Sequence, residues 1–382
     1  MRFDTRLVHE GQTPAPGTGD IVPPLHLAVT YSRSAQDPPR YFYARGENPT
    51  REDLERCLAA LEDVRFATAY ASGQAAAVTV LSLLRPGDRL VASDDVYGGT
   101  HQLLEQARSQ GITVEQADLS DARRRDRVLS PQAGRLDLVW LESPTNPLLK
   151  ITDIAAVSAA AHSRGALVLV DNTLASPALQ QPLALGADIT LYSATKFLGG
   201  HLDVLGGALV CADETLHERF ANYRTMAGNA AAAMDCFLIH RGVKTLSLRV
   251  ARQVGNARAV VAALAAEPAV GAVYFPGLAT HPGHELATRQ MREPGALASF
   301  EFHGDPVKLL DRCELFAPAV SLGGVRSLIE CPAFMTHRPV PRQTRLRLGV
   351  SDNLIRLSMG IEDPADLVED LTGAIRDVAA TH

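Results

Sequence analysis

The sequence contains few cysteines, and they do not come in pairs. Five of its 382 residues are cysteine, standing singly at Cys57, Cys211, Cys236, Cys313 and Cys331. Because there is no CxxC pair and no histidine cluster beside them, neither a zinc site nor a disulfide framework is indicated. We therefore expect no metal and a reducing, cytoplasmic setting.

Long apolar runs and an excess of positive charge are also missing. The chain opens on polar sequence from Met1 to Arg6, and no apolar run approaches the roughly 18 residues of a membrane span. Lys and Arg number 37 against 43 Asp and Glu, which gives a net charge of -6. This balance does not suit nucleic acid or an acidic lipid surface, so we expect small-molecule partners.

Two sequence patterns are absent as well. The chain has no internal repeat, and no GxGxxG motif opens a helix after the first strand, which counts against a Rossmann-type dehydrogenase. What remains is an ordinary composition, with 46% hydrophobic residues over 382 positions. That length is sufficient for one large α/β domain and a smaller second one.

The pattern along the chain predicts three parts. Residues 1–50 are rich in proline and glycine and lack sustained periodicity, so we expect an extended arm that contacts a partner subunit. Residues 51–245 should form an α/β domain, because short apolar strands alternate there with helices. Residues 246–382 change character and should form a smaller α+β domain.

The α/β part should begin with a helix capped by Thr50, on which Leu54, Leu58 and Leu61 share one face. Six strands are predicted after it, at residues 90–92, 112–114, 138–141, 166–170, 189–192 and 208–211. In the smaller domain we expect a helix over 246–266, strands over 297–302 and 354–358, and a closing helix from Asp363. Ligand sites in mostly parallel sheets lie at the carboxyl ends of the strands.

Two motifs directly after predicted strands carry the chemistry. Asp171 follows one strand, and the run Ser193-Ala194-Thr195-Lys196 follows the next. Pyridoxal phosphate (PLP) needs a lysine for covalent attachment, hydroxyl and N–H groups for its phosphate, and a carboxylate for its pyridine nitrogen. Taken alone, Lys196 has the alternative of a surface lysine, and Asp171 that of a helix cap. Together they favour a PLP site.

Two further motifs fit the same interpretation. Ser72-Gly73-Gln74 opens an Ala-rich helix and offers N–H groups to an anion, although many such helix starts bind nothing. Tyr97 follows a strand and could stack on a flat cofactor, or simply pack on the sheet edge.

The chain resembles the Cys/Met-metabolism family of PLP enzymes, which includes cystathionine γ-lyase, cystathionine γ-synthase and methionine γ-lyase. The matching stretches occur in order along nearly the whole chain, at residues 43–50, 97–100, 142–147, 193–196, 241–246, 321–324, 332–337 and 356–362. The resemblance implies PLP fold type I, the aspartate-aminotransferase-like α/β fold with a mostly parallel sheet and a smaller α+β C-terminal domain. It also implies a homotetramer built as a dimer of dimers.

The resemblance assigns roles to individual residues. Lys196 would carry the cofactor as a Schiff base and shuttle protons, and Tyr97 would stack on the ring and assist. Arg356 would clamp the substrate carboxylate through its planar fork. The other implied cofactor contacts are Tyr43 and Arg45 from a partner subunit, Gly73, Gln74, Asn146, Asp171, Ser193 and Thr195, and the other implied substrate contacts are Ser327, Arg326 and Glu142.

The match breaks at a few positions. The family usually has an acidic residue at the position of Arg326, where a cationic substrate group would be received, whereas arginine would repel a cation and attract an anion. His101-Gln102 also stands where cystathionine lyases commonly have an arginine, and Leu202 replaces a usual serine. We interpret these changes as altered specificity on retained chemistry, with neutral drift at an exposed rim as the alternative.

The resemblance implies γ-elimination or γ-replacement on a γ-substituted, sulfur-containing L-amino acid. The alternatives are β-elimination and loss of a non-sulfur group such as halide in a specialised pathway. From other classes we considered the dehydrogenase and a non-catalytic relative. The presence of Lys196, Asp171 and Tyr97 disfavours the latter.

Overall fold

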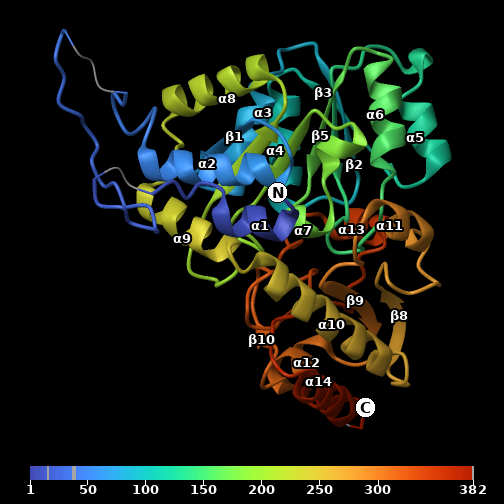
Figure 1. Cartoon of the computed structure of the whole chain (residues 1–382). Coiled ribbons are helices and arrows are strands. Elements are labelled where there is room, and N and C mark those ends of the chain that lie inside the picture. The colour runs from blue at the N-terminus through green and yellow to red at the C-terminus, as the bar shows by residue number, and fades with distance from the viewer. Residues whose placement is uncertain (15–16, 37–39, 381–382) are drawn as a thin grey trace.

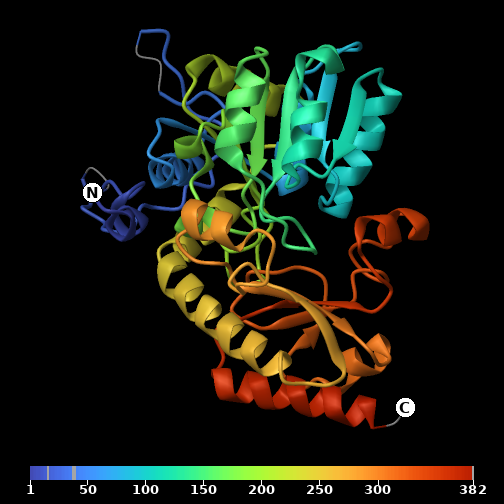
Figure 2. The same ribbon diagram turned by 90° about the vertical axis from the view of Figure 1, so that its right-hand side faces the viewer.

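The computed structural model describes residues 1–14, 17–36 and 40–380. Its two sheets lie one above the other, and each is covered by helices (Figures 1 and 2). Residues 15–16 and 37–39 of the predicted arm fall outside the description. No helix within the described ranges is long and apolar enough to cross a membrane.

The larger sheet has the order β1-β7-β6-β5-β4-β2-β3. Strands β2 to β6 run parallel to one another, whereas β7 is antiparallel to both β6 and β1. Its strands are β1 Phe66–Tyr70, β2 Arg89–Ser93, β3 Thr113–Ala117, β4 Leu138–Glu142, β5 Leu167–Asp171, β6 Ile189–Tyr192 and β7 Gly207–Cys211. Strands β2, β4, β6 and β7 are buried throughout, as expected of a sheet covered on both faces.

Helices pack on both faces of this sheet and form separate apolar clusters with it. They are α1 Phe3–His9, α2 Pro49–Leu61, α3 Gly73–Leu81, α4 Gly98–Ser109, α5 Ala122–Val128, α6 Ile154–His162, α7 Ser176–Leu179, α8 Glu214–Ala227 and α9 Ala233–Val243, with short 3-10 turns at Pro131–Ala133 and Pro182–Leu185.

The second sheet has the order β10-β11-β12-β9-β8 and its own core. Its strands are β8 Val270–Tyr274, β9 Leu297–Phe302, β10 Ala317–Pro318, β11 Leu328–Glu330 and β12 Leu354–Ser358. The accompanying helices are α10 Leu246–Leu264, α11 His284–Gln290, α12 Pro306–Arg312, α13 Arg342–Leu348 and α14 Pro364–Ala379. The start of α10 at Leu246 supports the domain boundary that we propose at residues 245–246.

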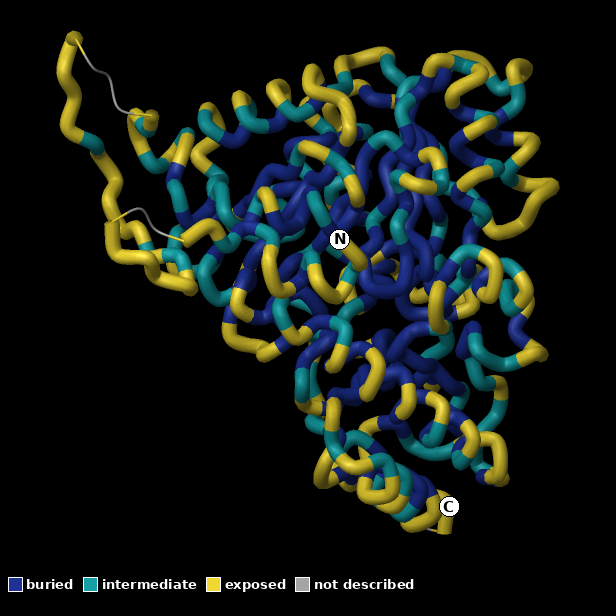
Figure 3. The backbone as a smooth tube through the Cα atoms, viewed as in Figure 1, coloured by how far each residue is buried: buried dark blue, intermediate teal, exposed yellow. Residues whose placement is uncertain are grey.

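Two predictions about the N-terminal part were wrong. Residues 3–9 form helix α1, which is anchored by buried Leu7, so the arm is not extended throughout. Helix α2 is capped by Asn48, whose side chain accepts the N–H of Arg51, while the hydroxyl of Thr50 accepts the N–H of His26. The described residues between α1 and α2, 10–14, 17–36 and 40–48, are mostly exposed, and much of this segment lies away from the body of the protein (Figure 3).

Candidate active site

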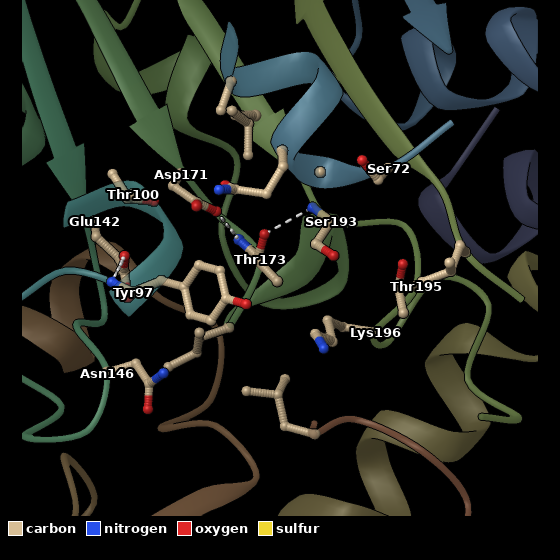
Figure 4. A pocket seen from close by; sticks show the side chains of 17 residues that line it. Ser72, Tyr97, Thr100, Glu142, Asn146, Asp171, Thr173, Ser193, Thr195 and Lys196 are labelled. Carbon is tan, nitrogen blue, oxygen red and sulfur yellow. Dashed lines mark hydrogen bonds between the residues drawn. The ribbon is translucent and has the colours of Figure 1, made fainter. Parts of the chain in front are cut away.

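A cavity of about 190 Å³ opens at the carboxyl ends of β4, β5 and β6 (Figure 4). This is the edge of the sheet where the sequence predicted a ligand site. The predicted site residues that line it are Gly73, Gln74, Tyr97, Glu142, Asn146, Asp171, Ser193, Thr195 and Lys196, and the others are Ser72, Ala77, Thr100, Thr173, Leu174, Leu191, Leu205 and Leu322.

Lys196 lies just after β6, and its amine points into this cavity (Figure 4). The Nζ atom donates a hydrogen bond of 2.9 Å to Ser321 Oγ. Burial lowers the pKa of Lys196 to about 8, and the positive charge of Arg356 acts in the same direction. A lysine with a lowered pKa has a larger neutral fraction, and the neutral amine is the nucleophile.

Asp171 ends β5 and also lines the cavity, on the side of Glu142 (Figure 4). Its Oδ1 accepts the N–H of Thr173 at 3.0 Å, and the hydroxyl of Thr173 accepts the N–H of Ser193 at 2.8 Å. Burial raises the pKa of Asp171 to about 6, although bonds from Thr173 oppose the rise. Thr173 thus connects the predicted ring partner to the predicted phosphate loop, a role that sequence reasoning missed because its two partners are on different strands.

The start of α3 forms a concave wall of the cavity. Ser72 caps the helix by accepting the N–H of Ala75 at 3.1 Å, while the N–H groups of Gly73 and Gln74 have no partner among the described residues. A Cβ at Gly73 would lie 2.9 Å from Ser193 Cβ, so only glycine allows this close approach. The N–H groups at the start of α3, the close approach that Gly73 allows and the nearby Ser193 together suit the binding of an anion.

Tyr97 precedes α4, and its ring projects into the cavity with the hydroxyl toward Lys196 (Figure 4). Tyr97 is 44% exposed, and its backbone N–H donates to Glu142 Oε2 at 2.9 Å. Burial, followed by the negative charge of Asp171, raises the pKa of Glu142 well above its ordinary value.

Arg356 reaches the same region from β12 of the second sheet. It is 2% exposed and donates to Asn146 Oδ1 at 3.0 Å and to the carbonyl of Ser321 at 2.6 Å. Its Nη1 also lies 2.7 Å from Oε1 of Glu330, its register partner on β11. Sequence reasoning missed Glu330; the signal that could have identified it is a charged residue in an otherwise apolar strand.

Three predicted substrate contacts are not in the cavity lining: Arg356, which reaches it only through its bond to the lining residue Asn146, Ser327 and Arg326. The N–H of Ser327 donates to Glu362 Oε1 at 2.6 Å, and its hydroxyl donates to Glu362 Oε2 at 2.9 Å. Arg326 is exposed and is not part of the lining.

The two arm residues also lie apart from this cavity. Tyr43 forms a β-bridge with Thr30, and Arg45 donates to the carbonyl of Thr225 at 2.6 Å. Both line a different hollow beside α8. A single chain therefore does not place them where the resemblance would have them act.

Comparison with known proteins gives the family directly. Residues 4–376 match the family described as Cys/Met metabolism PLP-dependent enzyme. A structure of CalE6 from Micromonospora echinospora, described as a cystathionine γ-lyase and elsewhere as a methionine γ-lyase, is 59% identical with a TM-score of 0.95 and covers 98% of this chain and 99% of its own.

Two further matches extend over the same length. Cystathionine β-lyase of Coxiella burnetii is 44% identical, covering 98% of this chain and 97% of its own. Cystathionine γ-synthase of Xanthomonas oryzae pv. oryzae in complex with cystathionine is 41% identical, with a TM-score of 0.97 and complete coverage of both chains.

These matches confirm the predicted fold class, the PLP cofactor and an enzyme of the cystathionine γ-lyase or γ-synthase type. Taken together, they do not favour the alternative of β-elimination or loss of a non-sulfur group, although the Coxiella relative is named as a β-lyase. The chain belongs to the Cys/Met metabolism family of PLP-dependent enzymes.

Proposed function

We propose that the protein catalyses γ-elimination or γ-replacement on a γ-substituted, sulfur-containing L-amino acid at the cavity around Lys196. The observation that carries this proposal is the convergence of an amine with a lowered pKa, a buried carboxylate, an aromatic ring and an open helix N-terminus on one cavity. Identification of the reaction product distinguishes elimination from replacement.

The residues present fit PLP. The approach of Gly73 to Ser193 leaves a hollow for the phosphate, with N–H groups that have no partner in the described part of the chain, and Asp171 offers a partly buried carboxylate for a protonated ring nitrogen. Tyr97 offers a face for the ring, and Lys196 offers the amine. When bound, PLP supplies an electron sink for the charge that develops at the substrate Cα.

The side chains have different proposed roles in the reaction. Lys196 Nζ is the group that takes the proton from the substrate Cα, assisted by the Tyr97 hydroxyl. For γ chemistry a second proton leaves Cβ before the Cγ substituent departs. Water then gives a 2-oxo acid and ammonia, whereas a bound nucleophile gives replacement.

Arg356 is the proposed site for the substrate carboxylate. Its guanidinium is held by Asn146, Ser321 and Glu330, so the fork is fixed before substrate arrives. Asn146 also lines the cavity and is proposed to contact the ring hydroxyl.

The assembly belongs to the same proposal. Tyr43 and Arg45 are proposed to complete the site of a partner subunit, since they lie outside the cavity of their own chain. The exposed apolar residues Ile21, Leu27 and Phe42 on the same arm support a subunit interface there. We further propose a homotetramer and a cytoplasmic location.

We also propose that Arg326, at the exposed rim of the site, determines substrate specificity. We expect Arg326→Glu to raise turnover of cystathionine several-fold relative to methionine, because a carboxylate would receive the distal amino group of cystathionine. Steady-state rates with both substrates test this. An unchanged or lower ratio would count against a role for this position.

The test of the function is a panel of γ- and β-substituted amino acids given to the holoenzyme. We expect 2-oxo acid and released thiol from γ-substituted thioethers such as cystathionine and methionine. Formation of products from β-substituted substrates alone would contradict the proposal.

A further inference from the structure

A second buried carboxylate lies beside Asp171 in the cavity. Glu142 ends β4 and Asp171 ends β5, and the two residues are register partners in parallel strands. Register partners project to the same face of the sheet, and neighbouring strands lie about 4.8 Å apart, so the two side chains start close together on one face. Both line the cavity, and Figure 4 shows them near one another on its wall. Two buried carboxylates in such proximity cannot both ionise without a large cost.

The hydrogen bonds of the two groups are unequal. Asp171 Oδ1 accepts the N–H of Thr173, whereas Glu142 accepts the N–H of Tyr97 only on Oε2. Glu142 Oε1 is buried and has no partner in the described part of the chain. Leaving an anionic oxygen buried without a donor is costlier than leaving a neutral carboxyl there. The arrangement therefore favours the proton on Glu142 and the charge on Asp171.

The charged groups around Glu142 also favour its neutral, protonated form. Asp95, after β2, is a third buried carboxylate on this side and is held by Thr145 Oγ1 at 2.5 Å. The nearby amine of Lys150 pairs with Asp94 and Asp118 instead. Lys196, the cation of the cavity, is bonded to Ser321 on the opposite side. No ion pair of Glu142 occurs among the described residues. Burial and the charge of Asp171 raise its pKa accordingly.

We propose that Glu142 is a positioning residue that works as a neutral carboxylic acid. Its Oε2 fixes the backbone of Tyr97, and therefore the stacking ring, while its proton leaves Asp171 as the anion that meets the pyridine nitrogen. This inference rests on the proposed function and assigns Glu142 to the cofactor, whereas the resemblance implied a contact with substrate.

Cofactor affinity separates the neutral from the charged form of Glu142. The protein is stripped with hydroxylamine and titrated with PLP, and binding is followed by quenching of Trp140, the one tryptophan of the chain, two residues before Glu142 on β4. Glu142→Gln copies the neutral acid, so we expect the PLP dissociation constant to stay within about threefold of the unmodified protein. If Glu142 were instead an anion near the pyridinium, its replacement by glutamine should weaken PLP binding at least about tenfold, at an effective dielectric of about 20.

Three matched variants complete the design. Glu142→Ala removes the acceptor for the Tyr97 N–H and should weaken PLP binding about tenfold. Glu142→Gln keeps this acceptor and should not show that loss. Asp171→Asn removes the ring partner and should weaken binding about 100-fold or more. Glu115→Gln changes a carboxyl group on β3, outside the cavity, and should have no effect. If Glu142→Gln weakens binding as much as Asp171→Asn does, the inference is overturned.

A second readout does not depend on the loaded enzyme. At neutral pH, the infrared spectrum of the stripped protein minus that of stripped Glu142→Gln should contain the carbonyl band of a protonated carboxylic acid, whereas the corresponding difference with Glu115→Gln should not. Subtraction is needed because burial also raises the pKa of Glu62, to about 7. Absence of the band from the Glu142→Gln difference spectrum would contradict the proposal. If the unmodified protein binds no PLP at all, the proposed function itself fails, which is a different result from an altered ratio among variants.

Discussion

At the scale of single residues, the protonation state of Lys196 decides whether the cavity can react. Its pKa of about 8 is caused first by burial and then by Arg356. At pH 7 about a tenth of the amine is neutral, compared with less than about a thousandth for a lysine in water.

We therefore expect the rate at which stripped protein acquires PLP absorbance to rise with pH and to level off above about pH 8, because the neutral amine is the reacting form. Stopped-flow absorbance across pH 6 to about 10 measures this. A rate that keeps rising up to the ordinary lysine pKa would contradict the assigned environment.

The buried pair of Arg356 and Glu330 gives a second prediction. Removing one partner of a buried ion pair leaves an uncompensated charge, so Glu330→Ala should lower the free energy of unfolding by about 3–5 kcal/mol. Glu330→Gln keeps an oxygen acceptor and should lower the free energy of unfolding by less.

Arg356→Lys loses the planar guanidinium fork and should raise KM at least about tenfold with a smaller change in kcat.

Urea unfolding and steady-state kinetics provide the two measurements. The pair Arg312 and Asp377 is exposed and serves as a control, since water screens it and Asp377→Ala should change stability far less than Glu330→Ala does. Equal losses in Glu330→Ala and Asp377→Ala would show that the buried pair does not hold Arg356.

At the scale of elements, the start of α3 determines how closely the phosphate loop can approach. Gly73→Ala would place a Cβ 2.9 Å from Ser193 Cβ, so one of the two segments must move. We expect PLP affinity to fall about tenfold, because the N–H groups at the helix start lose their alignment. Fluorescence titration measures the loss.

The matched control is Gly373→Ala on α14, where nothing lies within 4 Å of the added Cβ. Alanine favours a helix over glycine by about 1 kcal/mol, so this variant should be slightly more stable with unchanged PLP affinity. Unchanged affinity in both variants would mean that the close approach of α3 is not required.

Elements with strong local signals could be predicted from the sequence. Strands β9 and β12 have the expected bounds, and the parallel strands β2, β4, β5 and β6 differ from the predictions by one residue or less at each end. Helix α1 and strand β1 were missed. Helix α1 is seven residues long and is anchored by tertiary burial of Leu7, while β1 pairs antiparallel with distant β7, so neither has a sufficient local pattern.

The same reasoning applies to the site. Lys196 and Asp171 could be found because each follows a strand within a recognisable motif. The contacts of Ser321 with Lys196 and of Glu330 with Arg356 could not, because one joins residues 125 apart and the other depends on sheet register. Long-range pairings of this kind leave no periodic trace in a sequence.

At the scale of the whole molecule, one chain holds Lys196 and Asp171 at its cavity, with Arg356 bonded to the lining residue Asn146, but it does not hold Tyr43 and Arg45 there. If arms are shared between subunits, a Lys196→Ala chain should complete the site of a Tyr43→Phe/Arg45→Ala chain. Mixed assemblies of these two inactive proteins should regain about a quarter of full activity. Activity no greater than that of the separate variants would contradict shared sites.

The central claim is that Lys196 carries the cofactor. Borohydride reduction of the holoenzyme, followed by proteolysis and mass spectrometry, tests it most directly. The account predicts that the pyridoxyl group is found on the peptide containing Lys196 and that Lys196→Ala is not labelled. Labelling of another lysine, with Lys196 unmodified, would contradict it.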